Sequence, residues 1–179
     1  MNLEQLRYPI GRFQVPEIIS EKLLQEAITI LEIFPENLKT LVQGLDEATL
    51  NMHYREGGWT LRQVIHHISD SHHNSYTRFK WALTEDNPII KAYDEKAWAE
   101  LSDYKTVPIT WSLEHVSIIH HKLVHLLRTL SDEQWDRTFR HPDTGAVMNL
   151  RELALMYSWH SMHHFAHIKN AMASLIKQN

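Results

Sequence analysis

The stretch YSWHSMHHFAHIKNA, residues 157–171, carries four histidines within eight positions and lies in the segment that decides the fold. An imidazole is costly in an apolar core unless its nitrogens find partners. On a helical wheel, His160 and His164 share the face that also carries Leu153 and Tyr157. Two histidines four residues apart on one helix face can bind the same metal ion. We therefore expect a helix with a cation against its inward face, rather than a face that is only solvated.

The other two histidines of this stretch are His163 and His167. On the same wheel His167 lies near the inward face and His163 lies at its edge. For both rings we expect a position around the metal site, or exposure to solvent, rather than ligation.

A second histidine-rich segment, WTLRQVIHHISDSHHNSYTRFK, spans residues 59–80. One border of its apolar stripe carries a polar row made of His67, Ser71, Asn74 and Arg78. We expect His67 to reach across the seam between helices and supply a third nitrogen. Asp70, Asn74 and Arg78 are candidates to orient a ligand ring or a bound water. The alternative is that the row only solvates the seam, and for Ser71 and Arg78 the two interpretations are evenly matched.

The remaining helical histidines have simpler expected positions. His66 and His73 point away from the apolar stripe and are expected at the surface. His72 falls within the stripe and is expected in the core or in a pocket wall. His120, in SIIHHKLVHLL, lies near the inward face of its own helix. It could be a fourth ligand, but we favour a pocket wall or a hydrogen-bonded core position.

Helical periodicity dominates the chain, and no segment shows a good alternating strand pattern. We expect an extended lead over residues 1–19, long helices over 20–43, 61–84, 112–130 and about 150–177, and a short helix over 94–101. SDEQWDRTF predicts a helical turn capped by Ser131, RHPDTGAVMN predicts a loop, and Pro35 predicts a kink or a break. The predicted fold is all-α: one domain, residues 1–179, forming an up-and-down-type four-helix bundle with a long crossover connection.

Composition excludes several classes of protein and of site. The formal net charge is −4 and no dense Lys/Arg block occurs, so we expect no binding to nucleic acid. No signal pattern or long apolar run is present, so we expect a cytoplasmic protein that does not bind membranes. Cysteine is absent although there are 14 histidines, so a site for a soft metal must use imidazole and carboxylate ligands.

Three imidazoles without a fourth protein ligand are typical of a catalytic metal site, which keeps a position open for water or substrate. We expect one divalent metal ion per chain. Zinc suits such ligands best, and nickel is also compatible. Such an ion is expected to lower the pKa of a bound water or a bound thiol and to polarise a carbonyl.

Three segments carry a family resemblance: YREGGWTLRQVIHHISDSHHNSYTRFKWALTEDNP, IKAYDEKAWAEL and MYSWHSMHHFAHI. With Gly57-Gly58-Trp59-Thr60 ahead of the first histidine motif, the chain resembles the YfiT-type branch of the DinB-like metalloproteins from YPIGRFQVPE onward. The resemblance implies a four-helix bundle (DinB-like), one metal ion on His67, His160 and His164, and a homodimer in the cytoplasm. Members are described as metal-dependent hydrolases, and some relatives are transferases of a low-molecular-weight thiol such as bacillithiol.

Two classes of function follow. The first is a metal-dependent hydrolase or thiol transferase that acts on a small molecule, and the sequence leaves the choice of reaction open. The second is a non-enzymatic metal-binding bundle or stress-response scaffold. A storage protein would show many equivalent weak sites, whereas an enzyme would show one tight site with exchangeable water.

Overall fold

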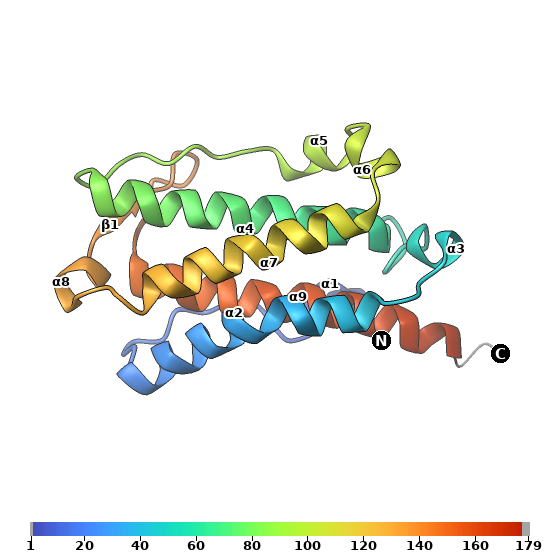
Figure 1. The fold of residues 1–179 in the computed structure, drawn as a ribbon, viewed down its shortest axis with the longest axis horizontal. Helices are drawn as coiled ribbons and strands as arrows, with labels where there is room; N and C mark the ends of the chain where they lie inside the picture. The colour runs from blue at the N-terminus through green and yellow to red at the C-terminus, as the bar shows by residue number, and fades with distance from the viewer. Residues whose placement is uncertain (1, 177–179) are drawn as a thin grey trace.

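The computed structural model describes residues 2–176 and shows a four-helix bundle, as the sequence predicts (Figure 1). The long helices are α2 (Glu21–Val42), α4 (Leu61–Thr84), α7 (Ile109–Leu127) and α9 (Leu150–Ile176). Each packs mainly against two others, in the order α2, α7, α4, α9 around the bundle. The predicted end of the last helix at residue 177 lies outside the described residues.

The expected crossover is the segment between α4 and α7. It contains two short helices, α5 (Glu95–Ala99) and α6 (Asp103–Thr106). In Figure 1 this segment runs back along the length of α4 before α7 begins, so α4 and α7 run in the same direction. Helix α4 thus lies between α7 and α9, so that one of its faces packs against α7 and another packs against α9.

Side chains at the helix starts satisfy backbone N–H groups that would otherwise lack partners. The Ser20 hydroxyl accepts from the Leu23 amide, and Thr60 forms a capping box with Gln63. Asn149 and Glu152 bond reciprocally at the start of α9. These caps fix where α2, α4 and α9 begin, and so fix the positions of their histidines along the bundle.

Several local details differ from the sequence prediction. The lead contains a short helix, α1 (Leu3–Arg7), because Asn2 and Gln5 form a capping box. Pro35 lies inside α2 without ending it, so of the predicted kink or break the break does not occur. The predicted loop at 140–149 is part of a hairpin of β1 (Thr138–Arg140) and β2 (Val147–Asn149), which pairs Phe139 with Met148. Three-residue strands are too short to show an alternating pattern, and burial of Phe139 holds the hairpin against the bundle.

The other short elements are α3 (Glu47–Leu50) and α8 (Asp132–Trp135), the helical turn that Ser131 caps as predicted. Helix α7 begins earlier than predicted, directly after Pro108. Within residues 2–176, no helix is both long and apolar enough to span a bilayer.

A layer of histidines separates two apolar clusters in the core. Phe34 belongs to one cluster and Tyr157 to the other, and the His72 ring packs against both. His120 and His160 contact His72 from α7 and α9. We call His72, His120 and His160 the histidine layer, because these rings cross the middle of the bundle where apolar side chains would otherwise meet.

Candidate metal centre

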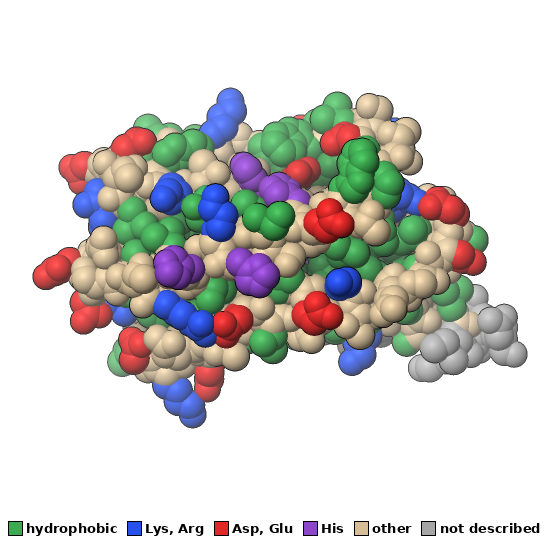
Figure 2. All heavy atoms as spheres, viewed as in Figure 1, with side chains coloured by type: hydrophobic (Ala, Val, Ile, Leu, Met, Phe, Trp, Pro, Cys, Tyr) green, Lys and Arg blue, Asp and Glu red, His purple; other side chains and the backbone are tan. Residues whose placement is uncertain are grey.

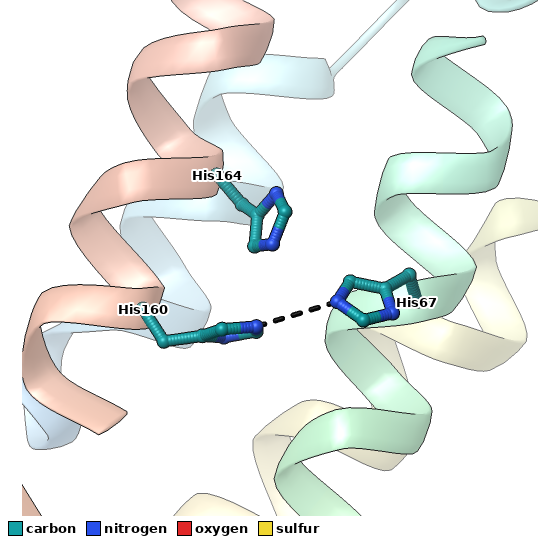
Figure 3. A group of neighbouring side chains, drawn as sticks. All are labelled: His67, His160 and His164. Carbon is teal, nitrogen blue, oxygen red and sulfur yellow. Dashed lines mark hydrogen bonds between the residues drawn. The ribbon is translucent and has the colours of Figure 1, made fainter. Parts of the chain in front are cut away.

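The structure brings together the three histidines that the sequence selected. His67 comes from α4, and His160 and His164 come from consecutive turns of α9 (Figure 3). One ring nitrogen from each lies within 4.8 Å of the other two. His67 and His164 are buried, while His160 keeps partial exposure. No carboxylate joins this group within the described residues.

The spacing of these nitrogens fits a shared ion. The Nε2 atoms of His67 and His160 lie 3.3 Å apart. Two imidazole nitrogens bound tetrahedrally at roughly 2.0–2.1 Å from one zinc ion would lie about 3.3 Å apart. Without an ion, one of the two nitrogens would have to donate a proton to the other. The donor set therefore suits zinc or a similar first-row ion.

Burial keeps the three imidazoles neutral, which is the form that binds metal. Desolvation lowers the pKa of His67 to about 4 and lowers the pKa values of His160 and His164 well below the ordinary imidazole value. Neighbouring rings of the same cluster lower the pKa values of His160 and His164 further. The site thus has lone pairs available at neutral pH without prior loss of a proton.

Other histidines hold the two ligands on α9. The His160 Nδ1 lies 3.2 Å from Nε2 of His72, and the His164 Nδ1 lies 3.3 Å from Nδ1 of His167. In each of these two pairs, the ligand ring is linked to its neighbour through Nδ1, the nitrogen that faces away from the metal position. His72 and His120 are core residues, as expected, and His167 contacts a ligand as expected.

A second histidine group, made of His163, His164 and His167, also lies within ligand distance. Its geometry is less suited to a separate ion, because His164 is shared with the first group and the Nε2 of His167 lies 3.2 Å from the Arg7 carbonyl oxygen. The His163 ring is buried and stacks on Trp159, with ring centroids 4.4 Å apart. Its Nδ1 has no hydrogen-bond partner among the described residues.

The three polar candidates on α4 make contacts other than those the sequence suggested. The Asp70 carboxylate accepts from the Tyr104 hydroxyl at 2.6 Å, and the Asn74 amide donates to the Asp70 carbonyl. Neither contact reaches a ligand ring. Arg78 is buried and donates to the Tyr157 hydroxyl at 3.2 Å, and its charge contributes to lowering the pKa of His160. Arg78 is thus the candidate whose charge reaches the site.

Ser71, for which the sequence left two interpretations evenly matched, lies beside the metal position. Its hydroxyl lies 3.4 Å from Nε2 of His160, the nitrogen that faces His67. Ser71 stands one turn after His67 on α4, so the i, i+4 spacing on the polar row was the available signal. A hydroxyl there can contact water or substrate beside the ligands.

The sequence prediction for His66 is wrong. Its side chain is 3% exposed, and its Nδ1 lies 2.7 Å from the Ser112 hydroxyl. Tyr104, from the crossover, covers the ring with centroids 5.4 Å apart. The face of α4 that looks solvent-exposed on a wheel is therefore covered by α7 and by the crossover. His73 is exposed as expected, His121 and His125 of α7 are also exposed, and imidazoles reach the surface over α7 in Figure 2.

A cavity of about 470 Å³ opens beside the metal centre. Its lining includes His163, His164, His167, Tyr54, Arg55 and Trp59. Trp59 also packs against His67, with ring centroids 4.7 Å apart. A volume of this size accommodates a small organic molecule next to one of the three ligands.

Comparisons with known proteins find one matching family and several similar proteins. The family model of the DinB superfamily matches residues 30–168. The chain is 47% identical over 168 residues to "Putative metal-dependent hydrolase YfiT" of Bacillus subtilis, covering 94% of each chain. It is 45% identical to "Putative metal-dependent hydrolase BH0277" of Halalkalibacterium halodurans, covering 93% of this chain and 96% of that one.

Solved structures show the same fold. The structure of YfiT from Bacillus subtilis, described as a probable metal-dependent hydrolase with an unusual four-helix bundle topology, superposes with a TM-score of 0.93. The superposition covers 96% of this chain and 98% of that chain at 46% identity. A mycothiol-dependent maleylpyruvate isomerase matches with a TM-score of 0.60 at 18% identity, covering 78% of this chain and 60% of its own, and shares the fold alone.

Proposed function

This chain belongs to the DinB superfamily, and we propose that it is a metal-dependent hydrolase with one divalent ion held by His67, His160 and His164. The observation that carries the proposal is the convergence of three neutral imidazoles from two helices, within 4.8 Å, beside an open cavity. Its close relatives bear the name of a metal-dependent hydrolase, which agrees with this chemistry. Zinc is the ion we propose first, and nickel second.

Some residues of the site would bind the ion, and others would contact the substrate. A bound divalent ion would polarise a carbonyl and lower the pKa of a water or thiol. His67, His160 and His164 would hold it, and the Ser71 hydroxyl, 3.4 Å from the His160 Nε2, can hydrogen-bond to a group placed there. Trp59 packs against the His67 ring and also lines the cavity.

The charge of the cavity favours an anionic small molecule. Among the described residues, Arg7, Arg55 and Lys96 line it, and Glu95 is the one acidic side chain in the lining. The Arg55 guanidinium is held by two neutral acceptors, the Tyr54 hydroxyl at 3.1 Å and the Glu56 carbonyl at 2.8 Å. Among the described residues no carboxylate forms an ion pair with it, so its positive charge is positioned but not paired. An arginine in this state suits a carboxylate or a phosphate group of a substrate.

Thiol S-transfer is the second candidate reaction at the same site. With no cysteine in the chain, a thiol that reacts there must enter from solution. The cavity beside His164 is large enough for a low-molecular-weight thiol, and its basic side chains suit a thiol that carries carboxylates. Arg55 and its neighbours would bind such a cosubstrate as they would bind an anionic substrate.

A metal-loaded assay separates these reactions. The protein would be loaded with one equivalent of zinc and tested against esters, amides and electrophiles, with and without added thiols. Hydrolysis without thiol, lost in His160→Ala, supports the hydrolase. Turnover only with thiol supports the transferase. No turnover together with several equivalent weak metal sites would overturn both and favour the scaffold.

A further inference from the structure

A hydrogen-bonded row of side chains connects the metal centre to the opposite side of the bundle. Starting at His160, Nδ1 lies 3.2 Å from Nε2 of His72. The Nδ1 of His72 lies 2.8 Å from Nε2 of His120, and the Nδ1 of His120 lies 2.5 Å from the Leu31 carbonyl oxygen. We call this row the inner chain. It joins α9, α4, α7 and α2 through three imidazoles.

The end of the inner chain determines the direction of every hydrogen bond in it. A carbonyl oxygen can only accept, so Nδ1 of His120 must carry the proton. A neutral imidazole has one N–H, so Nε2 of His120 accepts from Nδ1 of His72. By the same rule, Nε2 of His72 accepts from Nδ1 of His160. The lone pair of His160 is then left on Nε2, the atom that faces His67.

Pro35 explains why the Leu31 carbonyl is available to end the chain. In an α-helix the carbonyl of residue 31 accepts from the amide of residue 35, but proline has no N–H. Pro35 lies inside α2, which continues on both sides of it. The Leu31 carbonyl therefore lacks its intrahelical partner, and the His120 imidazole supplies the missing donor.

The second ligand on α9 has an equivalent arrangement, the outer chain. The Nε2 of His167 lies 3.2 Å from the Arg7 carbonyl, so it must donate to that oxygen. The Nδ1 of His167 then accepts from Nδ1 of His164 at 3.3 Å. The lone pair of His164 is thereby also left on Nε2. The third ligand, His67, has no such support, since its Nδ1 is buried without a partner in the described part of the chain.

We propose that the inner and outer chains are positioning devices that fix His160 and His164 as Nδ1–H tautomers, with Pro35 creating the inner anchor at Leu31. The proposal rests on the metal site proposed above. His72, His120 and His167 are positioning residues that act through the ligands and do not touch the ion. Such partners of a ligand imidazole orient its ring and raise its basicity.

The first test reads the tautomers directly in the zinc-free protein at pH 7.5. Two-bond ¹H–¹⁵N correlation spectra of ¹⁵N-histidine-labelled protein distinguish Nδ1–H from Nε2–H rings. We expect the Nδ1–H form at His120, His72, His160 and His164, and the Nε2–H form at His167. An Nε2–H ring at His72 or His160 would overturn the inner chain, and an Nε2–H ring at His164 would overturn the outer chain.

The second test measures zinc affinity by competition with a chromophoric chelator. His72→Leu removes the acceptor for His160 and should weaken zinc binding about 10–100-fold, as for other partners of ligand histidines. His72→Gln keeps one donor and one acceptor and should recover most of that loss. The control is His73→Leu, the same substitution at the next, exposed position, which should bind zinc as the native protein does. Equal affinity in His72→Leu and His73→Leu would overturn the proposal.

Pro35→Ala separates the role of the Leu31 carbonyl in the inner chain from a general loss of stability. Alanine restores an amide that competes for the Leu31 carbonyl, yet it is a better helix residue than proline. We expect a higher melting temperature together with weaker zinc binding. Unchanged zinc affinity would remove Pro35 from the proposal. If His72→Leu does not fold, the tautomers measured in the native protein still test whether the two chains exist.

The two tests distinguish failure of this inference from failure of the proposed function. The stated tautomers in a protein that binds no zinc would support the chains and refute the metal site. Tight zinc binding with other tautomers would refute the chains and leave the metal site intact.

Discussion

Acidification should unfold the metal-free protein, because many of its histidines are buried in the neutral form. Burial lowers the pKa of His66, His67, His120 and His167 to about 4 and that of His163 to about 3. In the unfolded chain the pKa of each of these histidines returns to about 6.5. The folded pKa values are the lower ones, so the unfolded state binds more protons below pH 6.5. Stability is therefore complete above that pH and is lost as pH falls from about 6.5 towards 4.

The magnitude is large compared with the stability of a typical domain. At pH 5.5, one unit below the unfolded pKa, each of these five buried rings lowers the free energy of unfolding by roughly 1 kcal/mol. Together they lower it by several kcal/mol, which is comparable with a typical free energy of unfolding of roughly 5–15 kcal/mol. We therefore expect the chelated protein to lose most of its stability between pH 7.5 and pH 5.5, and bound zinc to oppose this loss.

Guanidinium denaturation of the chelated protein at several pH values measures the effect. The slope of the unfolding free energy against pH gives the number of protons taken up on unfolding. His73→Ala, at an exposed site, should leave the slope unchanged, whereas His167→Leu should reduce it by about one proton. An uptake of one proton or fewer near pH 5.5 would refute the view that these rings are buried and neutral.

Three further outcomes are expected. His67→Ala, His160→Ala and His164→Ala should each weaken zinc binding more than the roughly 100-fold upper effect of a ligand's partner, whereas His73→Ala keeps one ion per chain by elemental analysis. Arg55→Gln should weaken benzoate binding about tenfold in NMR titrations but leave binding of the neutral analogue benzamide unchanged. The control Arg128→Gln removes a distant arginine, paired with Glu32, and should not change benzoate binding. Equal weakening of benzoate binding by both substitutions would refute the anion site. A small thiol added to cobalt-substituted protein should produce a thiolate-to-metal charge-transfer band if S-transfer is the reaction, and a spectrum insensitive to thiol would count against it.

The main helices and the three proposed ligands could be predicted because both depend on local spacing. His160 and His164 stand four residues apart on an apolar face, and His67 borders the apolar stripe of α4. The capping pairs of Thr60 with Gln63 and Asn149 with Glu152 are local in the same way.

The features that escaped the sequence depend on distant parts of the chain. His66 is buried because Ser112 and Tyr104 cover it, and neither lies near it in the sequence. The link from His120 to Leu31 requires α7 to meet α2 at the turn where Pro35 leaves a carbonyl free. A helical wheel shows which side of one helix is polar, but it does not show which helix will cover that side.

The histidine layer also limits how the helices can slide past one another. Apolar side chains tolerate many alternative alignments, since one leucine can replace another in a contact. His72 needs a partner on α7 and another on α9, and His120 needs the Leu31 carbonyl on α2, which Pro35 leaves without an intrahelical donor. A slip of one turn by any of these helices would leave buried ring nitrogens without partners, at roughly 1–3 kcal/mol for each lost hydrogen bond. The layer thus selects one alignment of the bundle before any ion arrives, and the two apolar clusters can then pack in only that alignment.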